Sequence, residues 1–279
     1  MVVIDKLQKK YKGFELNVSM NIKEGAVTGL IGKNGAGKST TIKAILGLIS
    51  PDGGSVKVMG NDPGVNMDAI GVALSDSGMS MLLTIHDIVS IMSATYAKFE
   101  REKFIKRCKK FELPMDKQIK DFSSGMKAKL KVLLAISHKA KLLVLDEPTT
   151  GLDVLARNEV LGMLREYLEE DSSRSILISS HISSDLEGLC DDIYMIDKGK
   201  IVMHEDTDVL LSKYGLLKMS EKEYEELDKQ FVTASKKEKF SITCLTNEKQ
   251  FYIDNYPGIV VENSSIDDII VLTLGRNEG

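Results

Sequence analysis

Short apolar runs alternate with helical patterns through the first two hundred residues of this 279-residue chain. The runs at 26–32, 141–146, 175–180 and 192–197 are rich in Val, Ile and Leu, which is typical of strands buried on both faces. Residues 154–170 repeat apolar positions at helical spacing. Strands that alternate with helices predict crossover units and a mostly parallel sheet covered on both faces. We therefore expect an α/β fold.

Two segments of the same region follow other patterns. Residues 14–22, FELNVSMNI, alternate apolar and polar positions, as expected of a half-exposed antiparallel strand. Residues 86–113 are helical and amphipathic without a strand signal, and Pro114 ends the pattern. We predict one α/β domain over residues 1–215, with an antiparallel β subdomain and a helical subdomain at about 76–140.

Residues 216–279 differ again and predict a small C-terminal α+β domain. A polar helical pattern at 219–230 precedes SITCLT, FYIDNY, GIVVEN and IIVLTL, whose apolar content is strand-like and too high for a disordered tail. About 64 residues are marginal for an independent domain. We expect this piece to pack beside the larger domain and to hold two subunits together. The alternative is a passive cap over an apolar patch.

Composition narrows the class of protein. The net charge of −4 argues against a nucleic-acid binder that works by bulk positive charge, so we expect no nucleic-acid partner. No window reaches 18 apolar residues, and the first residues lead directly into strand-like sequence, so we expect neither a membrane span nor a signal segment. Cys108, Cys190 and Cys244 lack metal-ligand or redox spacing, which predicts reduced, packed thiols.

A glycine-rich stretch follows the first buried run. Residues 32–39 fit the pattern G-x-x-x-x-G-K-[ST] between a predicted strand and a predicted helix, the context of a phosphate-binding loop. Lys38 would reach the β- and γ-phosphates, and Ser39 would ligate Mg²⁺. Backbone N–H groups and the helix amino terminus would bind the phosphate oxygens. The expected nucleotide-binding residues are Gly32, Asn34, Gly35, Ala36, Gly37, Lys38, Ser39 and Thr40.

Two carboxylates are adjacent here: Asp146 ends the apolar run at 141–146 and Glu147 follows it directly. An isolated Asp-Glu pair is common at a solvated strand end, but the phosphate loop earlier in the chain favours a catalytic role. We expect Asp146 to orient Mg²⁺ and its waters, and Glu147 to accept the proton of the attacking water.

Four motifs, GKNGAGKST, FSSGM, LLVLDEPTTGLD and ISSHI, occur in an order and at spacings that resemble the ATP-binding subunit of an ATP-binding cassette (ABC) transporter. The resemblance covers residues 1 to about 215. FSSGM resembles the family's signature motif, normally Leu-Ser-Gly-Gly-Gln, and it retains Ser123 and Gly125. The resemblance implies that these two residues bind the γ-phosphate held by the other subunit of a head-to-tail dimer. Ser123 is also a candidate N-cap, and the helix behind it would offer N–H groups to an anion.

Three further residues gain roles from the resemblance. Asp153 resembles the D-loop aspartate that crosses the dimer interface, and His181 resembles the switch histidine that contacts the γ-phosphate and orders the attacking water. Tyr11 resembles the aromatic residue that stacks on adenine, although an aromatic near a strand is more often a packing residue.

The family's Q-loop glutamine is missing here. By register Ser75 takes its position with Asp76 beside it, and either residue could approach Mg²⁺ through water. The following residues 79–84, MSMLLT, either receive a helix of a membrane partner or belong to the core.

The resemblance implies a Mg²⁺-dependent ATPase at the cytoplasmic face of the membrane that powers a transporter. Its partners would be permease subunits and a second ATPase subunit, which is either a copy or a paralogue. Within transporters the chain is similar to ABC-2 exporters such as those for bacitracin resistance and phenol-soluble modulins. This implies export of an amphipathic peptide, antibiotic or lipid-like molecule.

Two other classes of protein compete with this interpretation. A non-transport ABC ATPase is the alternative, but the chain lacks a long coiled-coil insertion, a second cassette and a strongly basic face. A P-loop kinase or GTPase would leave FSSGM and His181 unexplained.

Overall fold

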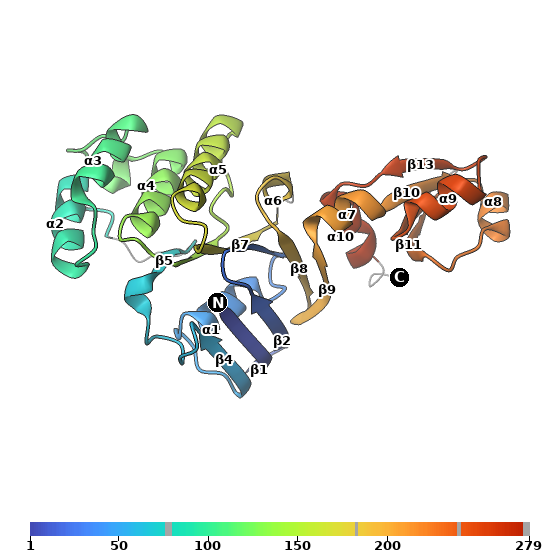
Figure 1. Cartoon of the computed structure of the whole chain (residues 1–279), viewed down its shortest axis with the longest axis horizontal. Helices are drawn as coiled ribbons and strands as arrows, with labels where there is room; N and C mark the ends of the chain where they lie inside the picture. The colour runs from blue at the N-terminus through green and yellow to red at the C-terminus, as the bar shows by residue number, and fades with distance from the viewer. Residues whose placement is uncertain (76–79, 182–183, 239–240, 276–279) are drawn as a thin grey trace.

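The structure, a computed structural model, describes residues 1–75, 80–181, 184–238 and 241–275. Two sheets organise these residues (Figure 1). A nine-stranded mixed sheet has the order β4-β1-β2-β9-β8-β3-β7-β6-β5, and a four-stranded antiparallel sheet has the order β11-β12-β10-β13. In Figure 1 the smaller sheet extends to one side of the larger one, and α10 lies at the junction, where it contacts α6 and β11.

The central strands of the large sheet are parallel and buried. Pairs β3–β7, β3–β8, β5–β6 and β6–β7 are all parallel. Every residue of β3, β6, β7 and β8 is buried, as the apolar runs predict. The strands of this sheet are β1 (Val2–Tyr11), β2 (Phe14–Ile22), β3 (Val27–Ile31), β4 (Gly53–Val58), β5 (Ile70–Ala73), β6 (Leu142–Asp146), β7 (Ser175–Ser180), β8 (Asp192–Asp197) and β9 (Lys200–Asp206).

An antiparallel portion forms one side of the same sheet. Strand β1 pairs with β2 and β4 in antiparallel register, and β2 joins the rest of the sheet through its parallel partner β9, where Asn17 lies opposite Lys200. Buried residues alternate with exposed or half-buried ones along β2, which confirms the pattern read at residues 14–22. The predicted α/β fold with an antiparallel part is confirmed.

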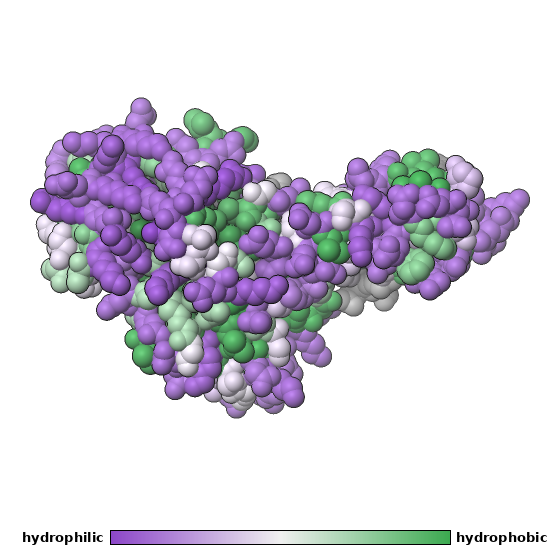
Figure 2. Space-filling model, viewed as in Figure 1, coloured by the Kyte–Doolittle hydropathy of each residue, from purple (hydrophilic) through white to green (hydrophobic). Residues whose placement is uncertain are grey.

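Three α-helices lie between β5 and β6 in the described part of this stretch and form a helical layer (Figure 1). The amphipathic stretch at 86–113 contains two helices rather than one. Helix α2 ends at Thr95 and α3 begins at Arg101, and between them Glu100 N donates to Ser137 O (3.0 Å) at the end of α4. Figure 2 shows mostly hydrophilic residues over the visible face of this layer. The helices are α2 (Ile85–Thr95), α3 (Arg101–Lys110) and α4 (Ser124–Ile136), with the short 3₁₀ helix η2 (Ile119–Asp121) before α4. Another short 3₁₀ helix, η1 (Met67–Ala69), precedes β5.

The other helices described before residue 215 connect strands of the large sheet, except that α7 leads from β9 to β10 of the smaller sheet. They are α1 (Lys38–Ile45), α5 (Val154–Glu169), α6 (Ser184–Glu187) and α7 (Thr207–Lys213). Met81 and Leu82, from the stretch at 79–84, are exposed, so the interpretation as core residues is wrong for these two.

The C-terminal region has more helix than its sequence pattern suggests. Its elements are β10 (Gly215–Met219), α8 (Glu221–Glu226), β11 (Val232–Lys237), β12 (Ile242–Thr246), α9 (Lys249–Asn255), β13 (Val260–Asn263) and α10 (Ile266–Gly275). The strand-like interpretation of FYIDNY and IIVLTL is wrong, because these stretches lie in α9 and α10. In α10, residues Ile266, Ile269 and Leu272 are buried at a spacing of three, so tertiary packing overrides the strand propensity of Ile and Val.

Helix α10 attaches the C-terminal region to the rest of the protein. Its residues Ile269 and Leu272 belong to the same apolar core as Leu186 and Cys190, and Ile266 N donates to Glu187 Oε1 (2.9 Å). A separate small core lies in the C-terminal sheet and is formed by Leu217, Met219, Leu227, Ile242, Cys244 and Tyr252. The region therefore packs beside the larger part of the chain, and its expected role in holding two subunits together stays a prediction.

Two expectations from composition can be compared with the described residues. None of the helices there is both long and apolar enough to cross a membrane. Cys108, Cys190 and Cys244 are free and buried, which confirms the prediction of packed thiols.

Candidate active site

Residues 32–37 connect β3 to α1 and form the loop that the sequence marks for phosphate binding. Gly37 has φ +119° at the N-cap of α1, a conformation that favours glycine, and a methyl carbon on Gly32 would lie 2.3 Å from Ile196 O. A cavity of about 270 Å³ lies against this loop and the helix amino terminus, where free N–H groups favour an anion. Its lining residues are Lys33, Asn34, Gly35, Gly37, Lys38, Ser39, Thr40, Ser75 and Glu147.

Lys38 places a buried cation at this cavity. The residue is 5% exposed, and its Nζ donates to Gly32 O (2.6 Å) and lies 3.1 Å from Glu147 Oε1. The two residues are far apart in sequence, so the fold is what pairs the phosphate-loop lysine with the proposed catalytic base.

Asp146 is the last residue of β6 and is almost fully buried. Its Oδ2 accepts hydrogen bonds from Ser39 Oγ (2.9 Å) and Ser75 Oγ (3.4 Å), and its Oδ1 accepts one from Ser179 Oγ (2.6 Å). The two residues expected to hold Mg²⁺, Ser39 and Asp146, are thus direct neighbours. Hydroxyl and carboxylate oxygens are ligands that Mg²⁺ prefers, so the residues present fit this ion.

Glu147 lies where the chain turns sharply after β6. Its φ of +53° is rare for a residue other than glycine, and its N–H donates to Ser179 Oγ (3.0 Å). Its Oε2 accepts a hydrogen bond from Thr150 Oγ1 (2.7 Å) and lies 2.5 Å from His181 Nδ1. Because an ionised carboxylate only accepts hydrogen bonds, His181 must carry its proton on Nδ1.

The environment of Glu147 keeps its side chain ionised. Burial acts to raise the pKa of this carboxyl group, but hydrogen bonds from Thr150 and His181 and the positive charge of Lys38 outweigh burial and lower the pKa. The group is thus a proton acceptor at neutral pH.

Several predicted residues gather here, and others do not. Asp146, Glu147, His181 and the phosphate loop lie together, with Ser75 in the position expected for one of the two Q-loop candidates, whereas Asp76 lies outside the described residues. Among the residues that line the 270 Å³ cavity, the predicted residues Tyr11, Ser123, Gly125 and Asp153 are not found.

The predicted residues outside the cavity have local partners. Ser123 Oγ accepts from Met126 N (3.2 Å) and caps α4, while Asp153 Oδ1 accepts from Ala156 N (2.8 Å) and caps α5. A methyl carbon on Gly125 would lie 3.2 Å from Ala156 Cβ, so the glycine brings α4 close to α5. Tyr11 is half exposed at the end of β1, with its ring centroid 6.5 Å from that of Phe14.

Two residues of the site are not among those that the sequence predicts. Ser179 bonds to Asp146 and to the backbone of Glu147, and Thr150 bonds to the Glu147 carboxylate. Ser179 is the next-to-last residue of the run SILISS, two positions before His181, where the carboxyl ends of neighbouring parallel strands meet, and that position is a usable signal.

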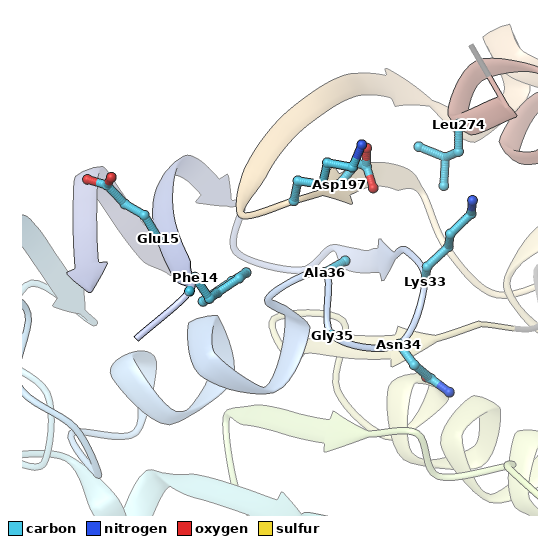
Figure 3. Close-up of a pocket in the computed structure, with 10 residues that line it drawn as sticks. Phe14, Glu15, Lys33, Asn34, Gly35, Ala36, Asp197 and Leu274 are labelled. Carbon is cyan, nitrogen blue, oxygen red and sulfur yellow. The ribbon is translucent and has the colours of Figure 1, made fainter. Parts of the chain in front are cut away.

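A second cavity, of about 440 Å³, borders the same loop and reaches the C-terminal region (Figure 3). In Figure 3 Phe14 lies beside the start of α1, the side chain of Lys33 extends toward Leu274 of α10, and that of Asn34 points the other way. Ala36 lines this cavity, and its carbonyl oxygen accepts a hydrogen bond from Gly199 N (2.9 Å).

Comparison with known proteins agrees with this geometry. The family model described as ABC transporter matches residues 16–150. The lantibiotic transport ATP-binding protein SrtF of Streptococcus pyogenes is 36% identical over 215 residues, which cover 75% of this chain and 92% of SrtF. This chain belongs to the ATP-binding subunits of ABC transporters.

A second relative of this ABC transporter subunit is the linearmycin resistance ATP-binding protein LnrL of Bacillus subtilis (strain 168). It is 31% identical over 227 residues, which cover 77% of this chain and 72% of LnrL. The dimeric ATP-binding cassette MJ0796, solved in a post-hydrolysis state with ADP and Pi, shares the fold with a TM-score of 0.66 at 22% identity. That likeness covers 74% of this chain and 99% of the cassette. ABC ATPases bind ATP, so ATP is the ligand expected at a site of this family.

Proposed function

We propose that this ABC transporter subunit hydrolyses ATP in a Mg²⁺-dependent reaction and that hydrolysis powers an exporter. The observation that carries the proposal is that Lys38, Asp146 and Glu147 gather beside the phosphate loop. Lys38 Nζ lies 3.1 Å from Glu147 Oε1, Ser39 Oγ lies 2.9 Å from Asp146 Oδ2, and the 270 Å³ cavity is lined by Lys38, Ser39 and Glu147. A buried cation, a pair of metal-binding oxygens and an ionised base are the groups that phosphoryl transfer to water requires.

Each residue has a distinct role in this reaction. Lys38 and the backbone of Gly35, Ala36 and Gly37 bind the phosphates, with Asn34 and Thr40 beside them. Ser39 and Asp146 would hold Mg²⁺, which when bound balances phosphate charge. Glu147 takes the proton of the attacking water, and His181 holds the Glu147 carboxylate in place.

The ion pair between Lys38 and Glu147 suggests how binding prepares the base. Phosphate oxygens compete with Glu147 Oε1 for Lys38 Nζ, which lies 3.1 Å from that oxygen in the structure. When phosphate becomes the partner of Lys38, Oε1 is released and can accept a proton from water.

The complete site is formed by two subunits. Ser123, Gly125 and Asp153 contact the nucleotide of the second subunit, and Tyr11 stacks on adenine. Two facts support the contribution of the second subunit: Ser123, Gly125 and Asp153 do not line the 270 Å³ cavity of their own chain, and the MJ0796 cassette is a dimer. Val154 and Leu155, directly after Asp153, are 72% and 73% exposed and offer apolar surface for such an interface.

The proposed setting is the cytoplasmic face of the membrane, where the subunit works with separately encoded permease subunits. The ATP-binding part comprises residues 1–215, with a helical subdomain at about 76–140, and residues 216–279 form the C-terminal domain. The printed names of SrtF and LnrL, which concern lantibiotic transport and linearmycin resistance, support export of an amphipathic peptide, antibiotic or lipid-like molecule.

Mixed dimers test the shared site. A Lys38→Ala chain should lose nucleotide binding, because a charge-assisted contact contributes about 1.5–3 kcal/mol, or roughly 10- to 100-fold in affinity. Combined with a Ser123→Arg chain, it forms a dimer in which one composite site carries both lesions and the other carries none. ATP hydrolysis, measured as phosphate release with Mg²⁺ and abolished by EDTA, should return on mixing.

A matched control puts both substitutions on one chain and pairs that chain with wild type. Both composite sites then carry one lesion each, and hydrolysis should stay absent. The composite site would be contradicted if isolated heterodimers, with Lys38→Ala on one chain and Ser123→Arg on the other, neither bound nor hydrolysed ATP.

A further inference from the structure

Lysine side chains along α4 make contacts in different directions. Lys131 Nζ donates to two successive backbone carbonyl oxygens, Leu74 O and Ser75 O, at 3.1 Å each. Lys129 Nζ instead donates to Glu159 Oε2 (3.0 Å) on α5 and to Phe111 O (3.4 Å). The helix that begins at the Ser123 cap is thereby attached to the loop that follows β5.

The loop held by Lys131 reaches the metal-binding carboxylate. Ser75 Oγ donates to Asp146 Oδ2 (3.4 Å), the same oxygen that accepts from Ser39 Oγ (2.9 Å). Lys131 also lines a cavity of about 520 Å³ together with Ser75, Asp146 and Glu147. A continuous set of contacts therefore runs from α4 through the Ser75 backbone and hydroxyl to Asp146.

Two carbonyl contacts from one ammonium group fix a backbone more closely than one would. Both oxygens belong to adjacent residues, so Lys131 restrains the position and the direction of the Ser75 peptide, and through it the Ser75 side chain. A charged donor suits this purpose because charge-assisted hydrogen bonds are about twice as strong as neutral ones.

We propose that Lys131 is a positioning residue for the hydrolytic reaction: it holds the Leu74–Ser75 backbone so that the Ser75 hydroxyl supports Asp146 in binding Mg²⁺. The inference rests on the proposed function. The contacts of Lys131 couple the helical layer to the metal site, because a movement of α4 moves the Ser75 hydroxyl relative to Asp146.

The test measures nucleotide binding rather than hydrolysis. Lys131→Met keeps most of the side-chain length and removes the ammonium group. Isothermal titration of ADP into the full-length protein in EDTA, and then over a series of Mg²⁺ concentrations, gives the affinity without metal and the half-saturating Mg²⁺ concentration. We expect wild-type affinity in EDTA and an approximately 10-fold rise in half-saturating Mg²⁺, since partners of metal ligands contribute about 10- to 100-fold in metal affinity.

Matched variants separate positioning from general packing. Lys131→Arg retains a charged donor and should restore most of the wild-type Mg²⁺ response. Lys129→Met removes an equally anchored lysine of the same helix and should leave that response unchanged. If Lys131→Met does not fold by circular dichroism, Ser75→Ala removes the hydroxyl directly and should show the same rise.

The outcomes distinguish the two proposals. Equal Mg²⁺ curves for wild type and folded Lys131→Met, or for wild type and Ser75→Ala, would overturn the role of Lys131. A wild-type protein that binds neither ADP nor ATP would overturn the proposed function itself.

Discussion

The large sheet with its helices and the C-terminal region bury different kinds of polar side chain. In the described residues before 215, buried side chains include the charged groups of Lys38, Asp146 and Asp185. In the described residues after 215, the buried polar side chains are the hydroxyls of Thr243, Thr246 and Ser264. Burying charge is costly unless it is paired, and the buried charges of the first region have partners, such as Glu147 for Lys38 and Arg157 for Asp185. Among its described residues the C-terminal region buries no charged side chain.

The largest effect is expected from a substitution that removes one charge from the first region. Glu147→Gln should lower ATP hydrolysis by about 10²–10⁴-fold, because the amide cannot accept the proton of water. ATP binding should persist, so that an ATP-bound dimer appears on size-exclusion chromatography. Glu166→Gln on α5, which alters a surface ion pair with Lys110 of α3, is the control and should hydrolyse ATP normally. A wild-type rate for Glu147→Gln would show that another group is the base.

A change in the C-terminal core should affect stability and leave the chemistry intact. Leu217 is fully buried in the small core, so Leu217→Ala should lower the free energy of unfolding by about 2–5 kcal/mol in urea titrations. ATP affinity at 25 °C should match wild type. Lys218→Ala, at the neighbouring exposed position of β10, should change stability by less than about 1 kcal/mol. A matching loss of ATP affinity in Leu217→Ala would break the contrast between the two regions.

The smallest expected effect is a pH dependence of stability. Burial acts to raise the pKa of Glu147, but Thr150, His181 and Lys38 together lower it below its ordinary value of 4.5. A group whose pKa is lower in the folded state adds stability above its unfolded pKa and loses that contribution as pH falls through the folded value. The stability difference between nucleotide-free wild type and Glu147→Gln should therefore be constant from pH 7 to about 5 and shrink below 4.5. A difference that grows on acidification would contradict the lowered pKa.

Local physics explains which features could be predicted from the sequence. The buried strands, the loop before α1 and the Ser123 cap depend on short-range patterns, and they form where those patterns lie. Helix α10 was missed although Ser265 and Asp268 form the reciprocal hydrogen bonds of a capping box, a signal present in the sequence.

The residues of the candidate site also divide into those that sequence motifs predict and those that only the fold brings together. Lys38, Asp146 and Glu147 could be read from motifs. The contacts of Ser179 with Asp146, of Thr150 with Glu147 and of Lys131 with the loop after β5 depend on the fold, since they join residues from separate elements or set a side-chain direction. Hydrophobic periodicity carries no information about such pairings.

The packing of α10 also affects how the chain can fold during synthesis. Leu186 and Cys190 share their apolar core with Leu272, which the ribosome adds roughly 80 residues later. At about 5–20 residues per second, that delay lasts roughly 4–16 s. During this interval the nascent protein carries an open apolar face beside α6, the short helix that follows His181. Strand β7, which ends at Ser180, can form early, but the packing of the segment behind it is completed only when α10 has left the ribosome.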